Sequence, residues 1–141
     1  LRGEQVFPQP LQKDQQILQW NGEVFGGIPL VDEQAGDTPA VFQLLSEHGI
    51  QALNQIEGPY ALCWIDGDRL YFARDPFGRR SLLYKLDHGC LSVSSIYPPD
   101  EEGWIEVLCD FIYHFHNGRL ELLPRDPPLL RSPSDTLLDL L

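Results

Sequence analysis

Thiols are the first side chains in this sequence that could carry chemistry. The 141 residues include three cysteines, Cys63, Cys90 and Cys109. Their number is odd, their spacing is wide and they form no CxxC pair, so neither a disulfide framework nor a zinc cluster is indicated. Reduced thiols are typical of the cytosol, and we therefore expect a cytoplasmic protein.

Two imidazoles form the next candidate group. His114 and His116 lie two positions apart, and therefore on one face of a possible strand. With Asp110 or Cys109 they could hold a metal ion, but no fourth ligand has a convincing spacing. A half-buried hairpin explains the same residues more simply, and we predict no metal site.

Charge excludes two classes of partner. The chain has 21 acidic and 10 basic side chains, a formal net charge of -11 and a pI near 4.5. Its longest basic stretch is Arg79-Arg80, which could bind phosphate but is interpreted here as a solvated turn. Binding to nucleic acid or to an anionic membrane requires clustered Lys and Arg, and no apolar run approaches the roughly 20 residues that span a bilayer. We expect neither partner.

The elements that would position these residues begin with a strand and two helices. Residues 16–20 predict a strand that stops at Asn21-Gly22, a pair that favours a sharp turn. Asp37-Thr38-Pro39 is a helix-start signal, apolar residues then recur at helical spacing, and Gly49 is placed where a helix would end. A second short helix is expected over Ile50–Ile56.

The remaining pattern is that of paired strands. Residues 60–65 are almost continuously apolar, as in a strand covered on both faces. Gly-containing turns at 66–68, 87–89 and 117–118 separate further strands over 69–73, 81–86, 90–94, 104–113 and 119–123. Helices grouped in one stretch among antiparallel strands predict an α+β fold. We expect the domain to span residues 1–123, and residues 124–141, rich in Pro, Ser and charge before an apolar end, to be a linker towards a further domain.

Three segments stand in a recognisable order. They read LQWNGEVF at 18–25, GDT at 36–38, and EGPYAL at 57–62 followed by ARDPFGRRSLLY at 73–84. Together they resemble the class II glutamine amidotransferase domain of the asparagine synthetase family, and the FGRRSLL form is most similar to asparagine synthetase domain-containing proteins. The resemblance covers roughly residues 15–95.

This resemblance implies an N-terminal nucleophile hydrolase fold, in which two stacked antiparallel sheets lie between helical layers (αββα). In that family a Cys at the first position attacks the side-chain amide of glutamine, with its own α-amine as the base. The ammonia then passes to a C-terminal synthetase domain. ATP and Mg²⁺ are expected only in that synthetase domain, and no cofactor is expected in this one.

The resemblance also assigns roles to particular residues. Asn21 and Gly22 match the oxyanion hole, where an amide and a backbone N–H face a developing negative oxygen; the alternative is a plain turn. Glu23 and Asp37 match the acids that receive the α-ammonium of the substrate; the alternatives are a solvated strand-edge charge for Glu23 and a helix N-cap for Asp37.

A further matching group is expected to be structural. Arg74, Asp75 and Gly78 match a family segment in which an Arg and an Asp after a strand order a tight turn.

The sequence departs from the family at the nucleophile. Leu1 stands where the family has its Cys, and the three internal cysteines have no free α-amine. We therefore expect a domain truncated at its N-terminal strands and inactive as a glutaminase in this form, whose complete protein supplies ammonia from glutamine for asparagine biosynthesis. Two alternatives remain: a non-catalytic interaction or regulatory module with the same fold, and an acidic binding domain unrelated to the family.

Overall fold

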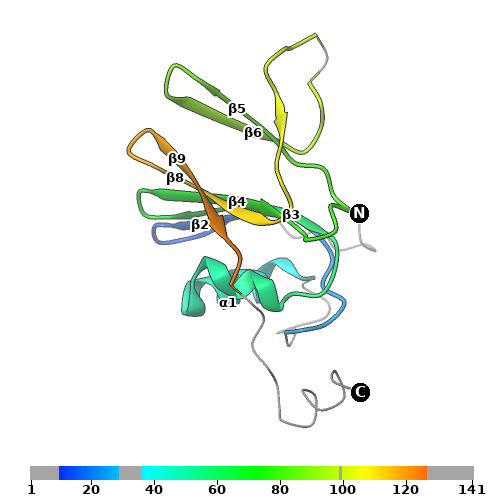
Figure 1. Ribbon diagram of the computed structural model, residues 1–141. Helices are drawn as coiled ribbons and strands as arrows, with labels where there is room; N and C mark the ends of the chain where they lie inside the picture. The colour runs from blue at the N-terminus through cyan, green and yellow to red at the C-terminus, as the bar shows by residue number, and fades with distance from the viewer. Residues whose placement is uncertain (1–9, 29–35, 99, 127–141) are drawn as a thin grey trace.

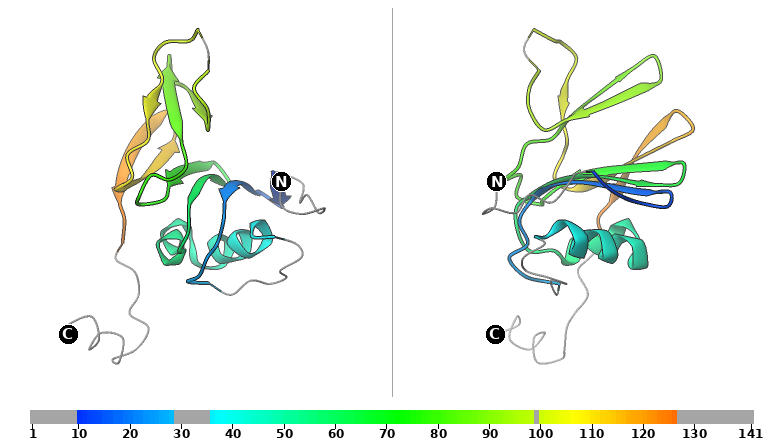
Figure 2. Two further views of the ribbon diagram at one scale, coloured as in Figure 1. Left: turned by 90° about the vertical axis from the view of Figure 1, so that its right-hand side faces the viewer. Right: turned by 180° about the vertical axis from the view of Figure 1, so that it is seen from behind.

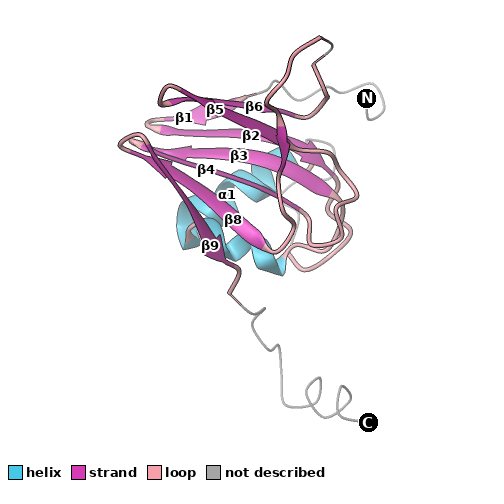
Figure 3. Ribbon diagram, turned by 45° about the horizontal axis from the view of Figure 1, so that its top comes forward, coloured by secondary structure: helices cyan, strands magenta, loops and turns pink. Residues whose placement is uncertain are grey.

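The fold is built on a six-stranded antiparallel sheet, seen in a computed structural model that describes residues 10–28, 36–98 and 100–126 (Figure 1). The strand order is β1-β2-β3-β4-β8-β9. Its strands are β1 (Leu11–Lys13), β2 (Gln16–Gly22), β3 (Tyr60–Asp66), β4 (Arg69–Arg74), β8 (Phe111–His116) and β9 (Arg119–Pro124). Figure 3 shows β2, β3, β4, β8 and β9 side by side, with α1 behind them.

Strand β3 is buried on both faces, which confirms the prediction from its continuous apolar sequence. Leu62 and Trp64 belong to the core between this sheet and the helices. Ala61 belongs to the core on the other face, and Cys63 packs against that second core. Because side chains alternate across a strand, one apolar run supplies two cores.

A helical layer covers one face of the six-stranded sheet (Figures 1 and 2). It consists of α1 (Thr38–His48) and the 3₁₀-helix η2 (Ile50–Gln55), close to the predicted helices. Pro39 lies in the first turn of α1, and Gly49 ends it with a φ of 84°. This positive φ favours glycine, because a Cβ would clash with the backbone.

A three-stranded sheet covers the opposite face. Its order is β6-β5-β7, with β5 (Leu83–Asp87), β6 (Cys90–Ser94) and β7 (Ile105–Glu106). The Tyr84 ring lies 5.7 Å from that of Phe72 and 5.2 Å from that of Tyr113, both on the large sheet. The described chain is thus stacked as helices, large sheet and small sheet, and the predicted α+β class with stacked antiparallel sheets is confirmed. In the described ranges, α1 and η2 lie on one side of the pair of sheets only.

Three predicted hairpins are present. Asp66 pairs with Arg69, Asp87 with Cys90 and His116 with Arg119, which leaves two residues in each turn. In two of the turns both residues have positive φ: 51° and 76° at 88 and 89, and 52° and 73° at 117 and 118. Such angles match the twist of the flanking strands.

The predicted turn at Asn21-Gly22 is wrong. Both residues continue β2, with Asn21 opposite Ala61 and Gly22 opposite Tyr60. A Cβ at Gly22 would lie 2.3 Å from the carbonyl oxygen of Pro59 and 2.7 Å from Tyr60 Cα. Glycine is required here for close approach of two backbones, and not for a turn.

Two further boundaries differ from prediction. The single strand expected over 104–113 is divided between β7 in the small sheet and β8 in the large one. Only Ile105–Glu106 pairs with β5, and the chain then crosses to the large sheet through residues 107–110. At the other boundary, β9 runs to Pro124 and Arg125 contacts the domain, so the packed region extends beyond residue 123. The expectations for Leu1, for residues 1–9 and for the tail 127–141 lie outside the described residues.

In the described part of the chain, no helix has the length and apolar character needed to cross a membrane.

The close approach of the two backbones at Gly22 predicts that a larger side chain at this position destabilises the fold. Gly22→Ala should lower the free energy of unfolding by about 1–3 kcal/mol, because the added methyl forces β2 away from Pro59. Urea unfolding followed by tryptophan fluorescence measures this change. Gly118→Asn is the matched control, since Gly118 has open space around it and Asn tolerates positive φ. Equal stability of Gly22→Ala and the parent chain would contradict the account.

Candidate functional site

The sequence-predicted site residues gather at one end of the six-stranded sheet. Neighbouring strands of an antiparallel sheet run in opposite directions, so the end of β2, the start of β3 and the end of β4 lie at the same end of the sheet. Gly22 is opposite Tyr60, and Ala61 is opposite Arg74. We call this region, formed by residues 21–24, 57–60, 74–80 and Asp37, the sheet-end site (right-hand side of the sheet in Figure 1).

Asn21 presents its side chain on the face opposite the helices. Its neighbour Trp20 is buried in the helical-side core, and side chains alternate along β2. Asn21 is exposed, and its amide has no hydrogen bond to another described side chain or backbone group. The amide is therefore available to a ligand at the strand end.

Glu23 directly follows β2, and the chain from Glu23 to Phe25 stays paired with residues 57–59. Its backbone N–H donates to Pro59 O at 2.9 Å, and Phe25 N–H donates to Glu57 O at 2.7 Å. Gly58 has a φ of 144° and packs so closely that a Cβ would lie 2.0 Å from Glu23 O. Residues 57–59 thus fix the position of the Glu23 backbone.

Asp37 joins the start of α1 to the same segment. Its carbonyl accepts the Val41 N–H at 3.0 Å, so its backbone starts the helix. Its side chain makes no capping bond; Oδ2 instead accepts the Val24 N–H at 2.8 Å. The N-cap interpretation therefore holds for the backbone of Asp37, and its carboxylate instead faces the segment that follows β2. The carboxylate of Asp37 lies beside the residue that follows Glu23.

Asp75 is a buried carboxylate at the end of β4, with no exposed surface. Its oxygens accept hydrogen bonds from the backbone N–H of Tyr60 at 3.2 Å, Phe77 at 3.2 Å, Arg79 at 3.1 Å and Arg80 at 3.4 Å. Arg79 Nε adds a charged contact at 3.1 Å. These bonds fix the turn after β4 to the start of β3.

The pKa of Asp75 reflects this environment. Burial alone would raise it, but the hydrogen bonds from Arg79 and from the backbone of Tyr60 and Arg80 outweigh burial, so the pKa lies below its ordinary value of 3.8. The carboxylate is therefore charged in the folded protein at neutral pH. Arg79 lies in an exposed turn, in agreement with the solvated-turn interpretation of Arg79-Arg80, and its side chain additionally pairs with this carboxylate.

Arg74 and Gly78 complete the turn. Arg74 donates through Nη2 to Gly78 O at 2.8 Å and through Nη1 to Val107 O at 3.2 Å. Gly78 has a φ of 66°, and a Cβ there would lie 3.0 Å from both Arg74 Nη2 and Cys109 Sγ. These contacts are those of a structural turn.

Arg125 is a residue that sequence reasoning missed. Its guanidinium donates to Cys109 O at 2.8 Å, Asn54 Oδ1 at 3.1 Å and Tyr60 Oη at 2.9 Å, and also to Arg74 O. Burial raises the pKa of Tyr60, an effect that the charge and hydrogen bond of Arg125 partly offset. No motif marks Arg125, because its partners come from four distant segments.

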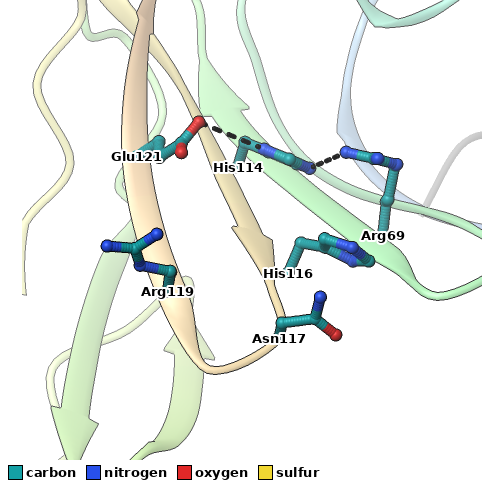
Figure 4. Close-up of a pocket in the computed structure, with 6 residues that line it drawn as sticks. All are labelled: Arg69, His114, His116, Asn117, Arg119 and Glu121. Carbon is teal, nitrogen blue, oxygen red and sulfur yellow. Dashed lines mark hydrogen bonds and ion pairs between the residues drawn. The ribbon is translucent and has the colours of Figure 1, made fainter.

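A second polar cluster lies at the opposite end of the sheet, around the β8–β9 hairpin (Figure 4). It forms a pocket of about 230 Å³ lined by Arg69, His114, His116, Asn117, Arg119 and Glu121. This pocket and the sheet-end site are separated by the length of β4.

Two arginines and one carboxylate line this pocket, and His114 lies between Arg69 and Glu121. Arg69 Nη1 lies 3.1 Å from His114 Nε2, and because Arg can only donate, this imidazole nitrogen is the acceptor. His114 Nδ1 then faces Glu121 at 3.8 Å, and the imidazole stacks on the Tyr71 ring at 4.7 Å. Among the residues that the structure describes, no three His, Cys, Asp or Glu side chains are grouped to hold a metal ion. The half-buried hairpin interpretation agrees with this arrangement.

The three thiols are free, and in the part of the chain that the structure describes none of them is hydrogen-bonded to an imidazole. Burial raises the pKa of Cys63 to about 11, so this thiol is protonated at neutral pH. A protonated thiol is a weak nucleophile.

Comparisons with known proteins agree with the fold and with the motif order. A family model described as "Glutamine amidotransferase domain" matches residues 4–98. Asparagine synthetase domain-containing protein 1 of Gallus gallus is 39% identical over 91 residues, which are 59% of this chain and 14% of that protein. Its Homo sapiens counterpart is 37% identical over 96 residues, 62% of this chain and 15% of that protein. The chain thus spans about a seventh of the length of these relatives.

Solved structures show the same fold at low identity. Glutamine phosphoribosylpyrophosphate amidotransferase from B. subtilis has a TM-score of 0.65 and 19% identity, over 89% of this chain and 33% of that one. A glutamine aminotransferase class-II domain protein from Silicibacter pomeroyi has a TM-score of 0.62 and 19% identity, over 87% of this chain and 72% of that one. The fold is that of the N-terminal nucleophile amidotransferases, and the interpretation as an unrelated acidic domain is wrong.

The contacts of Asp75 predict a large, pH-dependent contribution to stability. Asp75→Asn should lower the free energy of unfolding by about 3 kcal/mol at pH 7, because a buried charge pair and several N–H partners are disrupted. Since the folded-state pKa is lowered, the contribution of the carboxylate is present above about pH 4 and is lost as the pH falls further.

Urea unfolding between pH 7 and pH 2.5 measures both effects. The parent chain should lose stability below about pH 4 more steeply than Asp75→Asn does. Asp87→Asn is the control, because Asp87 pairs with His88 on the surface and should contribute less than about 1 kcal/mol. Parallel pH profiles for the parent chain and Asp75→Asn would contradict the prediction.

Proposed function

Starting from the fact that this chain belongs to the glutamine amidotransferase domain family, we propose that its sheet-end site binds glutamine. The observation that supports this proposal is that Asn21, Gly22 and Glu23 follow one another at the end of β2, where the Asp37 carboxylate accepts the N–H of the next residue, Val24. The Asn21 amide and the carboxylates of Glu23 and Asp37 can serve the two polar ends of one amino acid.

The side-chain amide of glutamine would meet Asn21 and Gly22. When a nucleophile adds to that amide, negative charge develops on its oxygen, and an Asn side-chain amide together with a backbone N–H can stabilise it. The residue at position 22 must be glycine because the backbone there closely approaches Pro59 and Tyr60. Each such donor contributes roughly 3 kcal/mol of barrier stabilisation in enzymes of this kind.

The α-ammonium of glutamine would meet the carboxylates. The backbone of Glu23 is fixed by Pro59, and Asp37 reaches the adjacent Val24 N–H. A positive ammonium beside two carboxylates makes charge-assisted hydrogen bonds, which are stronger than neutral ones.

In the complete protein, the released ammonia would supply asparagine formation in a C-terminal synthetase domain. This step is supported by the names of the relatives, which are asparagine synthetase domain-containing proteins. ATP and Mg²⁺ would be required in that synthetase domain, and residues 127–141 would lead towards it. The sheet-end site itself would need no cofactor, since its proposed chemistry uses amide, carboxylate and thiol groups.

A polypeptide of these 141 residues would bind glutamine without hydrolysing it. Its three thiols lie at internal positions, so none has the free α-amine that serves as the base in this family. The raised pKa of Cys63 keeps this thiol protonated at neutral pH, which makes it a weak nucleophile. Binding without hydrolysis is also what a regulatory module with this fold would do, which keeps that alternative open for the complete protein.

The proposal predicts specific binding of L-glutamine to the 141-residue chain. Titration with L-glutamine should shift the NMR signals of the Asn21 side-chain amide and the Gly22 and Val24 backbone amides, and the same samples should release no glutamate. Glu23→Gln should weaken binding about 10- to 100-fold, the value of one charge-assisted hydrogen bond.

Glu47→Gln is the matched control, because Glu47 lies on the exposed face of α1 and contacts Gln43. Glutaramide, which lacks the α-ammonium, should bind weakly to the parent chain and equally to Glu23→Gln. Shifts confined to the Arg69–His114 pocket, or glutamate release by this polypeptide, would contradict the proposal.

A further inference from the structure

Arg125 joins four parts of the fold through one guanidinium group. Its acceptors are the carbonyl of Cys109 before β8, the side chain of Asn54 in η2, the hydroxyl of Tyr60 in β3 and the carbonyl of Arg74 in β4. The helical layer, two central strands and the connection from the small sheet thus share one donor. Lysine could not replace this donor, because its single ammonium lacks the planar fork of Arg.

Two of these acceptors, Tyr60 and Arg74, belong to the sheet-end site. Tyr60 pairs with Gly22, and its N–H donates to Asp75 Oδ1 at 3.2 Å. Arg74 is the residue before Asp75, whose N–H donates to Tyr60 O at 2.9 Å. Arg125 therefore holds the start of β3 through the Tyr60 hydroxyl and the end of β4 through the Arg74 carbonyl, and Asp75 joins the same two strand ends through the backbone of Tyr60.

The stacking of Tyr60 extends this effect to β2. Its ring lies 5.4 Å from that of Trp20, with the planes 22° apart. Trp20 directly precedes Asn21, and Glu23 N–H is bonded to Pro59 O, the residue before Tyr60. The position of Tyr60 thus sets the spacing between the Asn21–Glu23 segment and its neighbour.

The acceptors of Arg125 are all uncharged. Each is a carbonyl, an amide oxygen or a hydroxyl, so among the described residues the guanidinium is held by directed hydrogen bonds to neutral groups and by no carboxylate. Such an arrangement gives geometric definition, because every bond fixes a direction.

We propose that Arg125 is a positioning residue for glutamine binding at the sheet-end site, acting through Tyr60 and Arg74. The proposal rests on the proposed function of that site. Arg125 lies beyond residues 4–98, the region that the family model matches, and beyond the boundary predicted at residue 123. The functional unit therefore includes the residue that follows β9.

The test compares Arg125→Gln and Arg125→Lys with Arg119→Gln in the 141-residue chain. Arg119 lies at the start of β9, the strand that Arg125 follows, and has no hydrogen bond or ion pair with another described residue, so it is a matched control. Both Arg125 variants should weaken L-glutamine binding about tenfold, a loss of about 1.4 kcal/mol, while the control stays within about twofold. Failure of Lys to rescue is expected, because positive charge alone does not set the geometry.

Amide hydrogen exchange provides a readout that does not depend on glutamine. In the Arg125 variants the N–H groups of Glu23 and Tyr60 should exchange faster, relative to the amides of the β5–β6 hairpin. Leu123→Ala, in β9, controls for general destabilisation. Leu123 packs against the core and is not one of the hydrogen-bond partners of Arg125.

The outcomes separate the two proposals. Absence of glutamine binding in the parent chain overturns the proposed function and, with it, the role of Arg125 in binding. If the parent binds glutamine and the Arg125 variants bind it equally well, or if Leu123→Ala weakens binding as much at equal loss of stability, the positioning role is overturned. Unchanged exchange at Glu23 and Tyr60 overturns it as well.

Discussion

The structure depends on one buried charge, the carboxylate of Asp75. It lies without exposed surface at the point where β4 ends, and it holds the start of β3 and the following turn through N–H groups from both. A carboxylate in such a place is costly unless nearly every lone pair is bonded. Because Arg79 and the backbone provide those bonds, the turn that bears Asp75 has little freedom to move.

The geometry of the sheet-end site follows from this constraint. Tyr60 is held to Asp75 through both its N–H and its carbonyl, and Gly22 is its partner in the next strand. Pro59, the residue before Tyr60, accepts a hydrogen bond from the Glu23 N–H. The next residue, Val24, donates its N–H to the Asp37 carboxylate. The candidate substrate-binding residues thus lie on backbone segments whose positions are fixed by Pro59, Tyr60 and Asp75.

Local patterns in the sequence predicted much of the fold. The apolar run at 60–65 predicted a doubly buried strand, and Gly-containing turns located three hairpins, because strand alternation and positive φ depend on neighbouring residues. Asn21-Gly22 misled the same reasoning: there the glycine serves a close contact with Pro59, which comes from far along the chain. Arg125 was missed for a related reason, since its four partners are 16 to 71 positions away.

The most direct test is a crystal structure of the chain with L-glutamine. The account predicts that glutamine lies at the end of β2, with its side-chain amide oxygen within hydrogen-bond distance of Asn21 or Gly22 and its α-ammonium facing Glu23 and Asp37. Glutamine bound in the pocket of Arg69 and His114, or bound at the sheet end with its ammonium directed away from both carboxylates, would contradict it.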